Sequence, residues 1–302
     1  MNVLIVKLGA TGDVVRTTTL LSRFKDHVTW VTDPKNKPLI EGVTPNLQVL
    51  EWANRDALHG KSFDLVINLE DDVETAGILK TVHVGRLFGA YEKSPGQMAY
   101  TEDSRKWFDL SLISVHGRSR ADELKFQNRS AYQELIFGGL GWNFAGEPYL
   151  LPSTDGSQLK GDVAIASEAG PVWPMKKWAY YDWLKSELEG RGLVVNYLQK
   201  RPTLLEHLAD VRGHRCLVSG DSLPMHLALG SRVPCVALFT CTSPWEIHDY
   251  GLLKKLVSPL LEEFFYKRAF DPRATTAISR EDVLSAVLQI VSRRHPGGVQ
   301  VD

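Results

Sequence analysis

The chain has 302 residues, 43% of them hydrophobic, which is enough for two domains that each bury their own core. Its 35 basic and 36 acidic residues give a formal net charge of −1 and are mixed along the chain, which disfavours nucleic-acid binding. No stretch approaches 18 consecutive apolar residues, and no basic segment precedes an apolar run at the start. We therefore expect a soluble, cytoplasmic protein with no signal peptide and no membrane span, for which peripheral membrane contact stays open.

The first half of the sequence alternates apolar runs with segments typical of helices or loops. The runs span residues 3–6, 28–31, 47–50 and 64–69, and this rhythm predicts a parallel sheet covered on both faces. Between 92 and 148 the pattern weakens, and we expect one helix from Arg129 to Leu140. Residues 151–162 combine Pro, Gly and polar residues, so we place the domain boundary there, with domains 1–155 and 156–302.

The second half repeats the pattern. Strands are expected at 163–166, 193–198, 215–218 and 233–238, and helices at 178–190, 203–211 and 222–230. A last helix, roughly 279–293, could pack back on the N-terminal domain. The fold class is therefore α/β with two Rossmann-like domains.

Three cysteines, Cys216, Cys235 and Cys241, lie in apolar or strand-like surroundings without a Cys-x-x-Cys pair. Their spacing with His214 matches no common zinc pattern. We expect free, mostly buried thiols and no metal site.

The stretch KLGATGDVVRTT, Lys7 to Thr18, follows the first predicted strand. It lacks the third glycine of a dinucleotide fingerprint and the Gly-Lys-Ser/Thr ending of a P-loop. Asp13 could be a general base facing a substrate hydroxyl, with Gly9, Thr11 and Gly12 forming a loop whose backbone a sugar or phosphate can approach. It could equally be the N-cap of a helix from Val14 to Phe24, and the motif alone leaves both interpretations open.

Acidic residues Glu70, Asp71 and Asp72 follow the strand at 64–69. We interpret them as solvated strand-end residues or acceptor contacts rather than as metal ligands. His83, His116 and His248 are expected to be structural or surface residues, although His248 could reach a cleft.

The stretch from Cys216 to Pro244 predicts a phosphate site, because Asp221 and Ser222 precede a helix and His226 lies one turn into it. An ordinary capped helix with a core histidine is the alternative. Thr242 and Ser243 follow the next strand, so they should lie at the same sheet edge. Lys176 stands before another helix and could neutralise a diphosphate, although a solvated charge is the commoner role there.

These three stretches together resemble the family 9 glycosyltransferases, which are heptosyltransferase-like enzymes of GT-B architecture. The motifs are the loop with Asp13, the segment KKW beginning at Lys176, and GDSLPMHLALGSRVPCVALFTCTSP. The resemblance implies two Rossmann-like domains facing across a cleft. It further implies that Asp13 is the catalytic base, that Lys176 contacts the donor phosphate, and that a donor site is formed by Asp221, Ser222 and His226, with Thr242 and Ser243 in the following loop.

Two positions depart from the family pattern. Leu223, followed by Pro224, stands where the family usually has glycine, and the acidic residue that would hold the nucleotide ribose has no clear match, since Glu206 is too far along. The sequence therefore leaves the nucleotide open, although the resemblance suggests ADP-heptose as the donor.

The expected function is inverting, metal-independent transfer of a sugar from a nucleotide diphosphate sugar to an acceptor hydroxyl, with no cofactor. The acceptor, whether glycan, protein or small molecule, and the oligomeric state stay open. One alternative is a nucleotide-sugar epimerase or phosphorylase on the same two-domain plan. Another is a non-catalytic nucleotide-sugar binding module, which Leu223 motivates.

Overall fold

The computed structural model describes residues 1–292, and the chain forms two compact units. The first comprises Met1–Ser153 and the short segment Trp245–His248, while the second comprises Thr154–Pro244 and the chain from Asp249 onward. The chain therefore leaves the second unit after Pro244, contributes four residues to the first unit, and returns.

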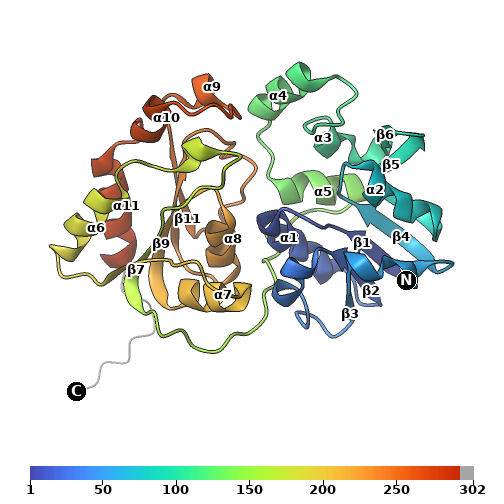
Figure 1. The fold of residues 1–302 in the computed structure, drawn as a ribbon, viewed down its shortest axis with the longest axis horizontal. Helices are drawn as coiled ribbons and strands as arrows, with labels where there is room; N and C mark the ends of the chain where they lie inside the picture. Colours follow the sequence, from blue (N-terminus) through green and yellow to red (C-terminus); the bar gives the residue numbers. More distant parts are fainter. Residues whose placement is uncertain (293–302) are drawn as a thin grey trace. The chain divides into compact units, whose positions relative to one another are not determined.

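The first unit is built on a six-stranded sheet in the order β3-β2-β1-β4-β5-β6 (Figure 1). Its strands are β1 (Val3–Val6), β2 (Val28–Thr32), β3 (Leu47–Glu51), β4 (Ser62–Asn68), β5 (His83–Ser94) and β6 (Gln97–Tyr100). All neighbours are parallel except β5 and β6, which form an antiparallel hairpin. β1 is buried along its whole length, as expected of a central parallel strand covered on both faces.

Helices and short 3-10 turns cover both faces of this sheet. They are α1 (Thr11–Thr17), η1 (Thr18–Arg23), η2 (Pro34–Leu39), η3 (Trp52–Leu58), α2 (Val73–Ala76), η4 (Gly77–Lys80), η5 (Glu102–Ser104), α3 (Arg105–Phe108), α4 (Arg118–Gln127) and α5 (Tyr132–Leu140). On one face, α1 and α5 pack on side chains such as Ile5 and Trp30. On the other face, η3 and η4 pack on Leu4 and Val66.

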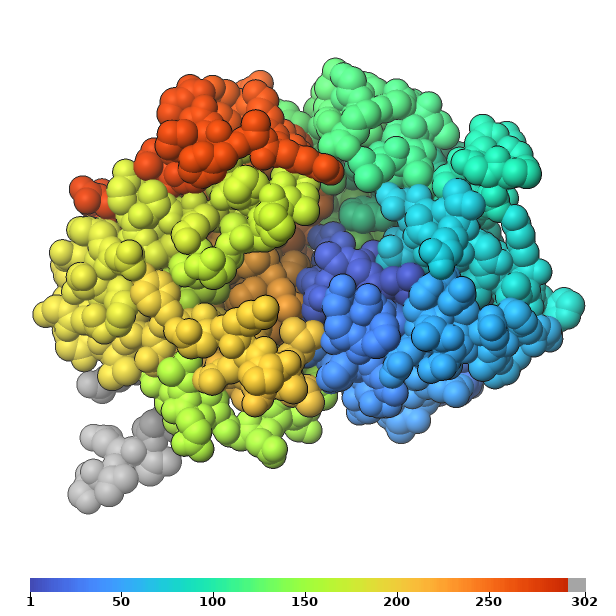
Figure 2. All heavy atoms as spheres, in the orientation of Figure 1, coloured from blue at the N-terminus to red at the C-terminus, as the bar shows by residue number. Residues whose placement is uncertain are grey.

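The stretch 92–148, which has the weakest sequence pattern, contains five elements that the sequence did not predict: the end of β5, β6, η5, α3 and α4. α4 buries only Ala121 fully, so its sequence carries no apolar stripe. The tip of the β5–β6 hairpin is exposed and projects from the surface in Figure 2. The predicted helix at 129–140 is α5, which begins three residues later.

The second unit is built on a five-stranded sheet in the order β11-β10-β9-β7-β8, and all its neighbouring strands are parallel. Its elements are β7 (Gly161–Ala166), η6 (Pro174–Lys176), α6 (Tyr181–Glu189), β8 (Val195–Tyr197), α7 (Leu204–Arg212), β9 (His214–Gly220), α8 (Leu223–Gly230), β10 (Cys235–Phe239), β11 (Leu253–Val257), α9 (Leu261–Phe264), α10 (Pro272–Thr276) and α11 (Arg280–Ser292). The sequence analysis did not predict β11, an edge strand that is partly exposed and carries two lysines.

In the second unit α6 and α11 lie on one face of the sheet, and α7 and α8 lie on the other (Figure 1). The last helix, which the sequence left free to return to the N-terminal domain, packs instead on α6 and β9 of its own unit. Val283 and Val287 of α11 join the core with Leu184 of α6, which gives this helix an apolar face to bury. Residue 293, the end of the predicted helix, lies outside the described residues.

The cysteines are free and buried, as predicted. Burial raises the pKa of the Cys216 thiol to about 12, so at neutral pH it is protonated. Within residues 1–292, no three His, Cys, Asp or Glu side chains gather as a metal ion would require. Across that same range, no helix is both long enough and apolar enough to cross a bilayer.

Candidate functional site

The glycine loop after β1 is filled by a carboxylate of the chain itself. Oε1 of Glu70 accepts hydrogen bonds from Lys7 Nζ at 2.8 Å, from the Leu8 amide at 2.7 Å and from the Gly9 amide at 3.2 Å. Glu70 is therefore not a solvated strand-end residue: it ties the end of β4 to the start of the loop.

The neighbouring acidic residue Asp72 also has a structural role. Its Oδ1 accepts from the Thr75 amide at 2.8 Å and its Oδ2 accepts from the Thr75 hydroxyl at 2.6 Å, so it caps α2.

Asp13 lies in the first turn of α1 and is not its N-cap. The helix begins at Thr11, its N-cap is Ala10, and no side chain caps it. The Thr11 hydroxyl donates to Asn36 Oδ1 at 2.7 Å, which ties the loop to η2. The Asp13 side chain is 35% exposed, and a Cβ atom added to Gly9 would meet nothing within 4 Å. Solvent therefore reaches both the carboxylate and the loop backbone, as a substrate-facing base requires.

Beneath Asp13 lies a buried arginine that the sequence analysis missed. Nη2 of Arg16 is 3.0 Å from Asp13 Oδ1, and its Nη1 is 4.0 Å from Glu246 Oε2. The guanidinium lies over the Tyr132 ring, 4.0 Å from its centroid, and 5.6 Å from that of Trp107. Burial lowers the pKa of Arg16, but Asp13 and Glu246 raise it more, so the guanidinium stays charged.

Glu246 belongs to the short segment that the first unit takes from the second half of the chain. Its backbone oxygen accepts from the Tyr132 amide at 3.0 Å, and its Oε1 lies 3.9 Å from Lys125 Nζ. The preceding Trp245 stacks under the Arg129 guanidinium, 3.7 Å from its ring centroid. The segment is thus held by backbone, ionic and aromatic contacts at once.

His248, at the end of this segment, packs edge-on against Phe144 with ring centroids 5.0 Å apart. The structure places it inside the first unit, in a packing role.

The donor residues predicted in the second unit gather where β9 and β10 end. Lys176 Nζ donates to the carbonyl oxygen of Asp221 at 2.7 Å and to its Oδ2 at 3.1 Å. Thr240, which follows β10, donates from its hydroxyl to the Met175 carbonyl at 2.6 Å and so fixes the turn that carries Lys176. A Cβ atom on Gly220 would lie 2.8 Å from the Lys176 carbonyl, so only glycine permits this approach.

Asp221 is ionised in this setting. Burial raises its pKa, but Lys176 and His226 outweigh burial, and the pKa falls to about 2. Its carboxylate therefore balances Lys176 at neutral pH and fixes where the ammonium points.

Ser222 occupies the N-cap position of α8 but does not cap the helix with its side chain. Its hydroxyl lies 3.0 Å from that of Ser219 instead. Thr242 and His226 are buried, and the buried Ser243 hydroxyl has no hydrogen-bond partner among residues 1–292. The prediction that Asp221 and Ser222 cap α8 is therefore wrong. Asp221 pairs with Lys176, and the Ser222 hydroxyl hydrogen-bonds to Ser219 of β9.

The two departures from the family pattern have structural counterparts. Leu223 is the first residue of α8 and is only partly buried, and Pro224 takes the second position, where it lacks an amide that would have no helical partner. Glu206 forms a capping box with Thr203 at the start of α7, because its Oε2 accepts from the Thr203 amide at 3.0 Å.

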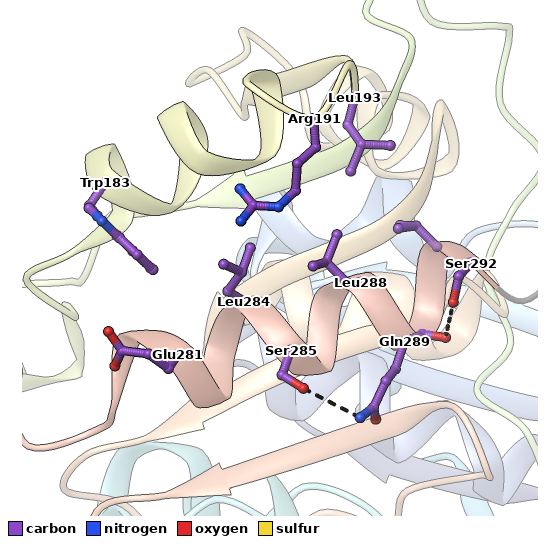
Figure 3. A pocket seen from close by; sticks show the side chains of 10 residues that line it. Trp183, Arg191, Leu193, Glu281, Leu284, Ser285, Leu288, Gln289 and Ser292 are labelled. Carbon is purple, nitrogen blue, oxygen red and sulfur yellow. Dashed lines mark hydrogen bonds between the residues drawn. The ribbon is translucent and has the colours of Figure 1, made fainter.

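A groove of about 660 Å³ lies between α6 and α11 (Figure 3). Apolar side chains line most of it, among them Trp183, Leu284 and Leu288, with Arg191 at its edge. It contains none of the predicted donor residues.

The two mainly parallel α/β sheets, each with helices on both faces and polar side chains at strand ends, define the Rossmann-like units of the GT-B class, as predicted. Solved glycosyltransferases share this fold. A family 9 glycosyl transferase from Veillonella parvula superposes with a TM-score of 0.62 at 18% identity, covering 96% of this chain and 97% of that one. The E. coli heptosyltransferase WaaC, solved with ADP-2-deoxy-2-fluoro heptose, gives 0.55 at 16% identity over 89% of this chain and 97% of its own.

The iron-containing dodecameric glycosyltransferase TibC from enterotoxigenic E. coli gives a TM-score of 0.57 at 12% identity, over 97% of this chain and 76% of that one. No family model matches the sequence, and a search of curated proteins finds no match. The likeness therefore lies in the fold.

Proposed function

We propose that this chain is a glycosyltransferase that moves a sugar from a nucleotide diphosphate sugar to an acceptor hydroxyl with inversion of configuration. The observation that carries the proposal is the Lys176–Asp221 pair at the start of α8, in a chain that shares its fold with solved heptosyltransferases. Together with the sequence motifs, it supports a site for an anionic leaving group.

The second unit would bind the donor diphosphate. An ammonium has three N–H groups, and two of those on Lys176 donate to Asp221, which leaves one for a phosphate oxygen. The amide of Leu223 and the hydroxyls of Thr242 and Ser243 would add further donors, since Pro224 has no amide and the amides of the next two residues donate to the Ser222 carbonyl oxygen. Charge that develops on the departing diphosphate would be stabilised by Lys176, the Leu223 amide and His226, and the proposal routes no step through a metal ion.

The first unit would supply the base. The acceptor hydroxyl would give its proton to Asp13 while its oxygen forms a bond to the anomeric carbon of the sugar. The bond from that carbon to the phosphate oxygen breaks in the same step, and the nucleoside diphosphate leaves with the electron pair. One displacement inverts the anomeric configuration.

The donor is proposed to be a nucleotide diphosphate heptose. The WaaC structure holds an ADP-heptose analogue, and a second TibC structure holds ADP-D-β-D-heptose. A ligand that binds only the folded state raises its melting temperature, so ADP-heptose, ADP-glucose, UDP-glucose and GDP-mannose should be compared in one thermal-shift series.

Product analysis with labelled ADP-heptose and candidate acceptors then tests transfer. Labelled product of inverted configuration supports the proposal. A shifted melting temperature with no release of ADP in the presence of any acceptor would identify a binding module instead, and an altered sugar still bound to its nucleotide would identify an epimerase.

A further inference from the structure

We propose that Arg16 and Glu246 are positioning residues for Asp13: Arg16 holds the Asp13 carboxylate in place, and Glu246 holds the Arg16 guanidinium from its other side. The inference deepens the proposed function, on which it rests for the role of Asp13 as base. The electrostatic link itself is a property of the three side chains.

Burial makes this link stronger than a surface ion pair. The Arg16 and Glu246 side chains are each 7% exposed, whereas the Asp13 side chain is 35% exposed. Water screens charges this deeply buried only weakly, so Arg16 and Glu246 act on the Asp13 carboxylate more strongly than an exposed ion pair would. Only the outer end of the chain of charges meets solvent, where a substrate would arrive.

Aromatic rings fix the geometry of Arg16. The guanidinium lies on the Tyr132 ring, and Tyr132 is held edge-on by Trp107 with ring centroids 4.8 Å apart. The Tyr132 hydroxyl lies 2.7 Å from that of Thr17, which locks the ring to α1. The guanidinium therefore cannot turn toward either carboxylate without leaving this stack, and it stays between Asp13 and Glu246.

Charged and titratable groups approach this cluster from several elements. Besides Arg16 on α1 they are Tyr132 on α5, Lys125 on α4, Glu246, Glu70 after β4, and Tyr149. Glu70 is paired with Lys7, and Lys125 lies close to Glu246. Arg16 lies between Asp13 and Glu246 and contacts both, so a change at Glu246 alters the surroundings of the cation that holds Asp13.

Glu246 also follows Ser243 by only three residues in the chain. The segment that adjusts the base is thus continuous with the loop proposed to contact the donor. Through this connection, Glu246 could link the donor loop to Asp13 as well as stabilise the first unit.

The first test titrates Asp13 directly and needs no acceptor. In the chain labelled with ¹³C at the Asp carboxyl carbon, the signal missing from Asp13→Asn identifies Asp13. Glu246→Gln removes a negative charge close to Asp13, which favours the ionised carboxylate, so we expect its titration midpoint to fall by about half a pH unit. Arg16→Met removes the charge, so the midpoint should rise by about one pH unit or more.

The matched control is Glu123→Gln on α4, which breaks an exposed pair with Arg120 and should leave the Asp13 midpoint unchanged. Glu246→Asp keeps the charge and should restore most of the wild-type midpoint. If Arg16→Met does not fold, Glu246→Gln, which changes no volume, carries the test. Equal midpoints in wild type and Glu246→Gln would overturn the inference.

The second test measures ADP release from ADP-heptose. Glu246→Gln should lower kcat about twofold to threefold and leave the donor KM unchanged, because a base weaker by half a pH unit slows proton removal by at most about that factor without changing donor binding. A fall in melting temperature with an unchanged midpoint would mean that Glu246 only stabilises the fold, which also overturns the inference. If instead Asp13→Asn keeps full turnover while the midpoints shift as expected, the proposed base is wrong and the link among the three side chains stands.

Discussion

The ammonium of Lys176 lies 3.1 Å from Oδ2 of Asp221 and 2.7 Å from its carbonyl oxygen. Asp221 therefore holds, at two atoms, the cation proposed to bind the diphosphate of the sugar nucleotide. Asp221 directly follows β9, and Lys176 ends η6. Their contact joins two segments 45 residues apart at the start of α8. This pair makes the donor side of the site testable by single substitutions.

Replacing Lys176 with Met should weaken ADP binding about tenfold to a hundredfold, because a charge-assisted hydrogen bond to phosphate is lost. Isothermal titration calorimetry with ADP measures this. Lys177→Met is the matched control, since that side chain is 54% exposed and pairs only loosely with Glu168 at 3.4 Å. Equal losses in both variants would argue against a specific role for Lys176.

The Asp221 carboxylate should make the free energy of unfolding of the second unit depend on pH in the acidic range. Its folded pKa of about 2 lies below the ordinary value of 3.8, so the stabilisation is present above pH 4 and is lost as the pH falls toward 2. The difference in pKa corresponds to about 2 kcal/mol. Urea unfolding of wild type and Asp221→Asn should show a stability difference that shrinks by about this amount between pH 6 and pH 2, and a constant difference would refute the assignment.

Gly220→Ala should displace Lys176, because the added Cβ would stand 2.8 Å from the Lys176 carbonyl oxygen. Overpacking of this kind costs about 1–3 kcal/mol, and ADP affinity should fall with it. Gly170→Ala is the control within the same unit, since its Cβ would meet nothing within 4 Å. Thermal unfolding and calorimetry on both variants check the two effects, and a Gly220→Ala protein that binds ADP normally would show that the turn can relax.

Asp13→Asn should reduce sugar transfer by about a hundredfold or more and leave ADP-heptose binding intact, because the variant keeps the shape of the side chain and loses its ability to take a proton. Initial rates of product formation and calorimetry separate the two. Asp26→Asn, which changes an exposed carboxylate of the same unit, should keep the wild-type rate. Normal transfer by Asp13→Asn would leave Asp13 as the partner of Arg16 and nothing more.

The first-half strands at residues 3–6, 28–31 and 64–69 were predicted because strands inside a parallel sheet are apolar on both faces, a signal that each short segment carries by itself. The strand at 47–50 is a half-exposed edge strand and was predicted from its apolar run alone. The same reasoning missed β6, α4 and β11, which are half-exposed and carry mixed side chains. Each of these elements is fixed by the neighbour it packs against, and a local sequence pattern does not identify a neighbour that is distant in the chain.

For the site, the sequence by itself determined which residues stand at strand ends and helix starts, as it did for Asp13, Asp221 and Thr242, because those positions follow from local patterns. Only the tertiary structure decided which charges meet. Glu70 fills the loop amides from 61 residues away, and Glu246 reaches Arg16 from the other half of the chain. An ion pair depends on the distance between its atoms in space, and for segments so far apart in sequence that distance exists only once the chain has folded.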